Sequence, residues 1–232
     1  MDKPPTPKRE ILGEVLATLS KDPLSVQFLA PWFRSLLPRH TPLSESIPWM
    51  TFRAIRWLKS YLGKDMDVFE YGAGGSTLFF ARRARTVVSV ENDPQWHDII
   101  ARALRERGIS NCDLRLVRAE PRSAPQGVAY GPTSYSSTTP DLADFSFEAY
   151  VRSIDSHPDR SFDLVSVDGH SRFSCVARAA PKVRPGGYLL LDNSDWQKYA
   201  GIMAYLAEFT RTDFDGAGPF QPTGWRTSVW RM

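Results

Sequence analysis

Apolar residues along this chain follow two spacings, one typical of strands and one typical of helices. Short apolar runs that fit strands occur at 67–70, 86–91, 113–118, 162–168 and 188–192. Segments with apolar residues at helical spacing lie between or after these runs, at 77–85, 94–107, 174–182 and 196–209. Strands separated by helices favour right-handed crossovers and a parallel sheet. We therefore predict an α/β protein with a doubly wound, Rossmann-like, mostly parallel sheet.

The two ends of the chain depart from this central pattern. The N-terminal part contains an amphipathic segment at 10–19, followed by short pieces rich in Trp and Phe between prolines. Near the C-terminus, Thr227-Ser228-Val229-Trp230 is the clearest strand and is placed to pair with 212–215 as antiparallel strands. We predict a helical N-terminal cap over 1–62 and a domain over 63–232 that ends in an antiparallel strand pair.

An insertion at about 121–150 interrupts the alternation of strands and helices. Its first part, 121–139, is rich in Pro, Gly, Ser, Thr and Tyr and is too long for an ordinary connection. Two interpretations are open, a surface loop without fixed structure and a lid over the functional site. The aromatic residues Tyr130 and Tyr135 favour the lid.

Composition narrows the class of protein. The net charge is +3, and Lys and Arg are scattered rather than gathered in runs, so we expect no nucleic-acid partner. The two cysteines, Cys112 and Cys175, lie far apart and are expected to be free thiols in a reducing compartment. No apolar stretch approaches the roughly 20 residues that span a bilayer, and no signal sequence is evident at the start. We expect a cytoplasmic protein without a membrane partner, and the oligomeric state is left open.

Carboxylates end four of the predicted strands: Glu70, Glu91, Asp168 and Asp192. In doubly wound sheets, ligands bind beyond the carboxyl ends of the strands, at the point where the strand order reverses. These four acidic residues are therefore predicted to converge on one crevice.

A glycine-rich turn follows the first of these strands, with the sequence Glu70-Tyr71-Gly72-Ala73-Gly74-Gly75-Ser76-Thr77. Gly72 and Gly74 allow backbone conformations and close approaches that a Cβ would prevent. Ser76 or Thr77 can cap the next helix and leave amide groups free for a carboxylate. Glu91, at the end of the next strand, is placed to accept the two hydroxyls of a ribose. This pattern serves nicotinamide dinucleotides as well as S-adenosylmethionine (SAM).

Two residues of the turn separate these cofactors. Thr77 stands where the dinucleotide fingerprint needs Gly or Ala against the helix. Glu70 would repel a pyrophosphate, but it suits a ligand that carries an ammonium and a sulfonium. We therefore predict SAM as the cofactor and keep a nicotinamide-dependent oxidoreductase as the less favoured alternative.

The sequence resembles the class I SAM-dependent methyltransferases over about 65–195. The resemblance is carried by four segments: Val68-Phe69-Glu70-Tyr71-Gly72-Ala73-Gly74, Val88-Ser89-Val90-Glu91, 162–169, and Arg184-Pro185-Gly186-Gly187 with the strand that follows. It implies that Gly72, Ala73 and Gly74 cradle the methionine part of SAM, that Glu70 lies near its amino group and that Glu91 holds the ribose. Asn92 and Glu120 are the candidates for the adenine side.

A finer resemblance is to metal-dependent O-methyltransferases of the catechol and caffeoyl-coenzyme A type. Those enzymes hold Mg²⁺ with an Asp after the fourth strand and an Asp-Asn pair after the fifth, and Asp168, Asp192 and Asn193 occupy the matching places. Bound metal would lower the pKa of a substrate hydroxyl. In the other interpretation, Asp168 contacts the cofactor and 192–195 caps the next helix.

The sequence departs from those enzymes where they carry a lysine base. It has Gly169-His170-Ser171-Arg172 instead, so His170 is the candidate base. No Asn-Pro-Pro-aromatic motif follows the fourth strand, which argues against a nucleic-acid base as acceptor. We predict a methyltransferase that acts on a small molecule, at oxygen, with Asp168 and His170 as catalytic residues and Trp196 and Tyr199 beside the acceptor. The alternative is a binding or assembly module that docks through the Trp- and Pro-rich N-terminal segment.

Overall fold

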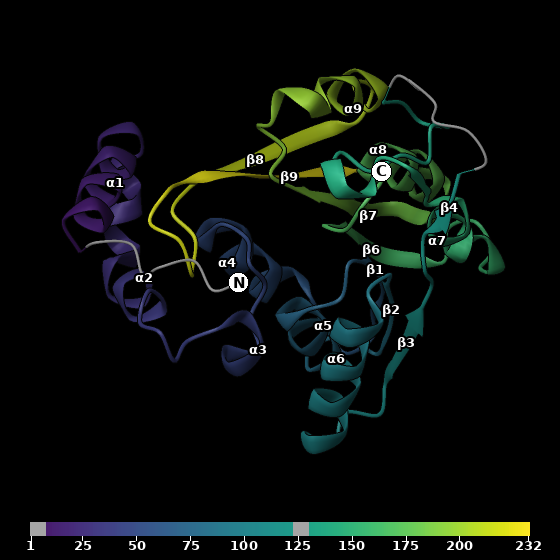
Figure 1. The fold of residues 1–232 in the computed structure, drawn as a ribbon, viewed down its shortest axis with the longest axis horizontal. Coiled ribbons are helices and arrows are strands. Elements are labelled where there is room, and N and C mark those ends of the chain that lie inside the picture. The colour runs from purple at the N-terminus through teal and green to yellow at the C-terminus, as the bar shows by residue number, and fades with distance from the viewer. Residues whose placement is uncertain (1–7, 123–129) are drawn as a thin grey trace.

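A seven-stranded sheet forms the centre of the protein in the computed structural model, which describes residues 8–122 and 130–232 (Figure 1). The strand order is β3-β2-β1-β6-β7-β9-β8. The strand bounds are β1 Asp67–Tyr71, β2 Thr86–Glu91, β3 Cys112–Leu116, β6 Phe162–Val167, β7 Val183–Asp192, β8 Thr210–Gly216 and β9 Trp225–Arg231. The first five strands in this order are parallel, and β9 runs antiparallel between β7 and β8. The predicted doubly wound sheet and its antiparallel C-terminal strands are confirmed.

Helices cover both faces of the sheet (Figure 1). One face carries α4, α5 and α6, which span Phe52–Tyr61, Gly75–Ala81 and Pro94–Glu106. The other face carries α7, α8 and α9, which span Glu148–Arg152, Arg172–Ala179 and Ala200–Tyr205. Successive residues of a strand point to opposite faces, so Val68 packs in the core under α4 and α5 while Phe69 packs in the core under α7 and α8.

Short elements complete the described part of the chain. The N-terminal ones are α1 Lys8–Lys21, η1 Pro23–Phe28, α2 Leu29–Ser35 and α3 Pro42–Glu45. The insertion contains β4 Glu120–Pro121, η2 Pro140–Leu142 and β5 Phe145–Ser146, and it is followed after α7 by η3 Ser153–Ser156. The remaining turns are η4 Ala180–Lys182 and η5 Gln197–Tyr199. No helix in the described residues is long and apolar enough to cross a membrane.

The N-terminal segment is tied to the connection between β8 and β9. The indole of Trp32 is fully buried and donates to the carbonyl of Gln221 at 2.8 Å. The amide of Phe52 donates to the carbonyl of Ala217 at 2.9 Å. Farther along, the backbone around α3 lies against Gly75, where an added Cβ would come within 2.2 Å of the Pro42 carbonyl. This close approach brings the N-terminal segment to the glycine-rich turn.

The last parallel strand and the helix after it differ from the sequence prediction. The Pro185-Gly186-Gly187 sequence was expected as a turn before a strand, but β7 begins at Val183 and runs through it. An irregularity in the pairing with β6 accommodates the three residues, and Gly186 adopts a φ of 82°. The helix expected over 196–209 is divided into η5 and the short α9.

Candidate functional site

The turn after β1 is held by close backbone contacts with the loop after β6. Gly72 has a φ of +93°, and its amide donates to the carbonyl of Val90 at 2.9 Å. A Cβ on Gly72 would lie 2.8 Å from the backbone of Gly169, so both steric room and φ require glycine. Gly74, in contrast, would bring a Cβ no closer than 3.7 Å to a neighbour, the Ser76 hydroxyl. The side of the turn at Gly74 is therefore open.

Glu70 lies beneath this turn. Its Oε2 accepts hydrogen bonds from the hydroxyls of Thr77 and Ser89, both at 2.6 Å. Its Oε1 is buried and has no hydrogen-bond partner among the described residues. Burial raises the pKa of Glu70 to about 7. Thr77 also accepts from the amide of Gly74, so Glu70 holds the turn from below through Thr77.

The expected capping of α5 is wrong in detail. Gly74 is the N-cap residue of this helix, and Thr77 lies three positions later, where its hydroxyl accepts from the Gly74 amide. Neither Ser76 nor Thr77 occupies the cap. The sequence pattern placed the helix start at Thr77, but the helix begins at Gly75.

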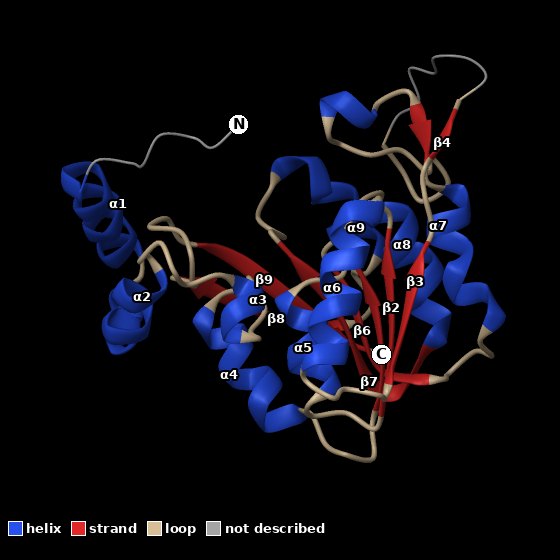
Figure 2. Ribbon diagram, turned by 60° about the horizontal axis from the view of Figure 1, so that its bottom comes forward, coloured by secondary structure: helices blue, strands red, loops and turns tan. Residues whose placement is uncertain are grey.

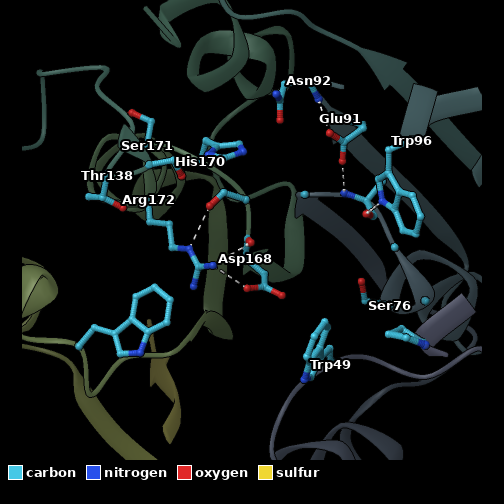
Figure 3. Close-up of a pocket in the computed structure, with 18 of the residues that line it drawn as sticks. Trp49, Ser76, Glu91, Asn92, Trp96, Thr138, Asp168, His170, Ser171 and Arg172 are labelled. Atoms are coloured by element: carbon cyan, nitrogen blue, oxygen red, sulfur yellow. Dashed lines mark hydrogen bonds and ion pairs between the residues drawn. The ribbon is translucent and has the colours of Figure 1, made fainter. Parts of the chain in front are cut away.

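Glu91 reaches the turn from the end of β2. Its Oε2 accepts from the amide of Ala73 at 3.1 Å, and its Oε1 accepts from the amides of Asn92 and Asp93 at 2.7 and 2.8 Å (Figure 3). Burial raises the pKa of Glu91 above its ordinary value. The three backbone donors fix the carboxylate at the edge of the open space beside the turn.

A cavity of about 370 Å³ opens beyond the carboxyl ends of β1, β2 and β6. It brings together most of the predicted cofactor residues: Gly72, Ala73, Gly74, Ser76, Glu91, Asn92 and Asp168. Trp96 forms part of its wall, and its indole donates to the carbonyl of Ala73 at 2.7 Å. The cavity lies at the point where the chain leaves β1 for β2 on one side and later returns to β6 on the other, as the ligand sites of doubly wound sheets do.

Three predicted cofactor residues, Glu70, Thr77 and Glu120, do not line this cavity. Glu70 and Thr77 are buried below the turn. Glu120 is exposed in β4, which pairs with β5 in a separate two-stranded sheet. β4 stands beyond the ends of β2 and β3 (Figure 2). Because Glu120 is not among the residues that line the cavity, its expected adenine role stays a prediction.

The expected metal position contains the guanidinium of Arg172. Its Nη2 lies 2.9 Å from Asp168 Oδ1 and 3.0 Å from the Asp168 carbonyl. Its Nη1 donates to the Asp192 carbonyl at 2.6 Å and to Asn193 Oδ1 at 3.2 Å. Its Nε donates to the Gly169 carbonyl at 3.0 Å. An arginine has five N–H groups, and this one makes four hydrogen bonds to the chain in addition to the ion pair with Asp168.

The three predicted metal ligands therefore do not fit a Mg²⁺ site. The described residues contain no group of three or more His, Cys, Asp or Glu side chains that could hold a metal ion. Asp192 is 2% exposed, and its carboxylate accepts from the Trp225 indole and the Thr227 hydroxyl. The capping interpretation is also wrong, because no side chain of 192–195 caps η5. Asn193 bonds Arg172, and Ser194 and Asp195 bond β9.

His170 lines the same cavity, and one of its ring nitrogens already has a hydrogen-bond partner. Its Nδ1 is 3.1 Å from the Ser137 hydroxyl, and its ring lies 5.0 Å from that of Phe147. Burial and the nearby Arg172 lower the pKa of His170, which favours the neutral ring. Its role as a base stays a prediction.

The described part of the insertion contributes to the same cavity. Thr138 and Thr139 form part of its wall, and Lys198 Nζ donates to the Thr138 hydroxyl at 2.8 Å. The Tyr130 hydroxyl accepts from the amide of Phe173 at the start of α8. Residues 123–129 of the insertion lie outside the described residues. Whether the segment opens and closes as a lid stays a prediction.

A second cavity, of about 230 Å³, adjoins the first. Its lining consists of Trp49, Asp168, Asp192, Asn193, Trp196, Gln221 and Trp225. Trp49, Asp168 and Trp196 line both cavities. Figure 3 shows the Asp168 carboxylate between Arg172 and Trp49, with one oxygen directed to the arginine and the other away from it. Asp168 therefore stands where the two cavities meet.

The aromatic residues of this site were only partly assigned to it from the sequence. Trp196 and Tyr199 were expected beside the acceptor, and both line the larger cavity. Trp49 and Trp96 were not assigned to the site from the sequence, and both are part of the cavity wall. The i, i+4 spacing of Asp168 and Arg172 was the one signal for their ion pair.

The overall fold is similar to that of several solved methyltransferases, although no family model and no curated protein sequence matches the chain. A methyltransferase from Geobacter sulfurreducens is 16% identical with a TM-score of 0.51, and the match covers 88% of this chain and 96% of that one. A precorrin-6y C5,15-methyltransferase from Geobacter metallireducens is 13% identical with a TM-score of 0.52, with 78% and 87% covered. A protein from Streptococcus mutans, solved in complex with S-adenosylhomocysteine (SAH), is 12% identical with a TM-score of 0.52, with 76% and 94% covered. The chain therefore has the fold of the class I SAM-dependent methyltransferases.

Proposed function

We propose that this protein is a SAM-dependent methyltransferase that acts on a small molecule. The observation that carries the proposal is the pair of adjoining cavities with Asp168 at their junction. The larger one has the open side of the glycine-rich turn and the fixed Glu91 carboxylate, which suit the methionine part and the ribose of SAM. The smaller cavity has aromatic and polar walls, and its volume suits a small acceptor. The basic residues are scattered along the sequence, which gives no reason to expect a nucleic-acid acceptor.

SAM would supply an electrophilic methyl group on a sulfonium, so the protein has little covalent chemistry to perform. Its contribution is to bind the two reactants in line and to accept a proton from the acceptor. The backbone at Gly72, Ala73 and Gly74 would hold the methionine part, and Glu91 would hold the ribose. Asp168 is placed to contact the acceptor, because its second oxygen is not directed to Arg172.

The expectation of an oxygen acceptor depended on a metal ion that activates a hydroxyl. Arg172 stands in the place of that ion and uses its N–H groups on the protein itself. Oxygen therefore loses the activating group that favoured it.

Titration calorimetry with SAH and with SAM tests the proposed cofactor. We expect both to bind, and Glu91→Gln to weaken binding about tenfold or more through the lost charge on the ribose side. Glu106→Gln is the matched control, since Glu106 is exposed at the end of α6. If a folded sample shows no heat with either compound, the proposed function is wrong. Binding of NAD in place of SAH would support the oxidoreductase alternative.

The alternative function is a binding or assembly module without catalytic activity. The N-terminal segment leaves several large apolar side chains exposed, among them Leu12, Leu16, Leu24 and Leu37. These are compatible with docking, but they do not touch either cavity. Methyl transfer to any small acceptor by the isolated chain would exclude a purely structural role.

A further inference from the structure

The smaller cavity differs in charge from the larger one. Its described lining contains two carboxylates, from Asp168 and Asp192, and no Lys, Arg or His. The cationic side chains nearby, Arg172 and Lys198, line the larger cavity instead. Three indoles, from Trp49, Trp196 and Trp225, form much of the remaining wall. Indole faces attract cations through their ring quadrupole.

The ion pairs leave one of these carboxylates without a cation. Arg172 Nη2 pairs with the side chain of Asp168. Asp192 receives only the neutral donors of Trp225 and Thr227 on its carboxylate, and it is almost fully buried. A buried carboxylate is stabilised when an opposite charge comes close. Burial and the charge of Asp168 raise the pKa of Asp192 well above its ordinary value, which favours the protonated acid while no cation is close. A bound ammonium would favour the ionised carboxylate and pair with it.

Trp196 already contacts a cation of the chain itself. Lys198 Nζ lies 4.1 Å from the centroid of the Trp196 ring. An ammonium group is therefore accommodated on one side of this wall. The other aromatic side chains of the smaller cavity, Trp49 and Trp225, have no such contact among the described residues.

We propose that the smaller cavity binds a small organic amine in its protonated form and that the amine nitrogen is the methyl acceptor. This inference rests on the proposed SAM-dependent methyltransferase function and names its substrate class. A neutral alcohol would supply no cation to Asp192, and a carboxylate would add a third acidic group beside Asp168 and Asp192.

The step is balanced with Asp168 as the proton acceptor. The bound ammonium gives one proton to the Asp168 oxygen that is directed away from Arg172. The freed nitrogen lone pair then forms a bond to the methyl carbon of SAM as the carbon–sulfur bond breaks, and that electron pair stays on sulfur to give SAH. The product leaves as the N-methylated ammonium ion, and the proton on Asp168 passes to solvent.

The test uses matched compounds on the full chain loaded with SAH, whose binding is measured first. Benzyl, phenethyl and cyclohexylmethyl frames are each offered as the amine, the alcohol and the carboxylate, with binding followed by tryptophan fluorescence. Transfer of a labelled methyl group from SAM to the same compounds is then measured. We expect the amines to bind at least tenfold more tightly than their partners and to be the compounds that receive label.

Asp192→Asn is the test variant, because Asp192 lines only the smaller cavity and asparagine keeps the shape of the side chain. We expect amine affinity to fall about tenfold or more while SAH affinity stays unchanged. Asp213→Asn is the control, since Asp213 also accepts a hydrogen bond from a hydroxyl of β9, that of Ser228, but lies outside both cavities. If Asp192→Asn does not fold, Gln221→Lys adds a positive charge at the same cavity and should likewise weaken the amines.

The outcomes separate the two proposals. Binding of SAH together with label on the alcohols or carboxylates would overturn the amine inference alone. So would binding of SAH with no amine bound above its alcohol partner, or amine affinity that is unchanged in both variants. Absence of both SAH and SAM binding would overturn the proposed function itself.

Discussion

Arg172 and Asp168 form the central ion pair of the site, with Nη2 of the arginine 2.9 Å from Oδ1 of the aspartate. The same guanidinium joins the loop after β6 to the end of β7 through the Asp192 carbonyl and the Asn193 side chain. One side chain thus fixes the position of the carboxylate that stands between the two cavities. This arrangement places a permanent charge of the chain at the position where the sequence predicted a metal ion.

Replacing Arg172 by Ala should therefore destabilise the protein strongly. The change leaves Asp168 without its partner and removes donors from three carbonyl groups. The two side chains are 11% and 27% exposed, so the loss should approach the roughly 3–5 kcal/mol that breaking a fully buried pair costs. Urea denaturation measures the free energy of unfolding. Arg172→Lys keeps the charge but loses the planar arrangement of donors, so we expect a smaller loss.

Arg178→Ala is the matched control for this prediction. Arg178 lies on the same helix and forms two bonds to Asp155, both at 2.6 Å, but its side chain is 45% exposed. Exposed pairs contribute about 0–1 kcal/mol. Equal losses for Arg178→Ala and Arg172→Ala would show that the buried network has no special weight.

Divalent metal should have little effect on the wild-type protein. Arg172 pairs with Asp168 and bonds Asn193, so a Mg²⁺ ion would have to displace a guanidinium that makes four hydrogen bonds and an ion pair. We expect millimolar Mg²⁺ to leave the melting temperature unchanged and EDTA to leave methyl transfer unchanged. Activity that is lost with EDTA and restored by Mg²⁺ would contradict this interpretation of the site.

The sheet could be predicted from the sequence because its strands are continuous apolar runs separated by amphipathic helices. The carboxylates at the strand ends could be predicted to converge for the same reason, and Glu91 and Asp168 do meet at one cavity. The partners of these side chains could not. Asp192 looked like a metal ligand, but its carboxylate bonds Trp225, which lies far along the chain and arrives only through the pairing of β7 with β9. Trp49 reaches the site because the N-terminal segment packs against Gly75, a contact without a local sequence signal.

Gly72→Ala should weaken both the fold and SAH binding. A non-glycine residue at a φ of +93° is strained, by about 1–2 kcal/mol, and the new Cβ would lie 2.8 Å from the Gly169 backbone. Forcing the two loops apart adds a further loss of about 1–3 kcal/mol. We expect SAH affinity, measured by calorimetry, to fall about tenfold or more because the turn must shift.

Gly108→Ala separates these two effects. Gly108 also has a positive φ, +62°, but an added Cβ there meets nothing within 4 Å. Its loss should be limited to the backbone strain of about 1–2 kcal/mol, with SAH affinity unchanged. If Gly72→Ala is no worse than Gly108→Ala, the contact between the two loops does not matter for the site.

The stability of the protein should depend on pH through Glu70. Its pKa is raised by burial from 4.5 to about 7, so the folded state retains a proton that the unfolded state has already lost between these values. The contribution of Glu70 is fully favourable below about pH 4.5 and is lost as pH rises to about 7, beyond which the loss is constant. At about 1.4 kcal/mol per pKa unit, the full change is about 3 kcal/mol.

Glu70→Gln removes this titration while keeping acceptor capacity for Thr77 and Ser89. The variant should gain stability relative to the wild type as pH rises from 5 to 8, by about 2–3 kcal/mol, when free energies of unfolding are measured in urea at each pH. Glu106→Gln, at an exposed position, corrects for effects that any such substitution has. SAH carries the same ammonium group as SAM, and this group would favour the ionised form of Glu70 if it bound nearby. The same pH series with saturating SAH therefore tests whether the ammonium lies close to the Glu70 carboxylate. A pH dependence that disappears when SAH is bound would place the amino group beside Glu70. A dependence that persists would mean that Glu70 only holds the turn through Thr77, and parallel profiles for wild type and Glu70→Gln would show that burial does not perturb this carboxyl at all.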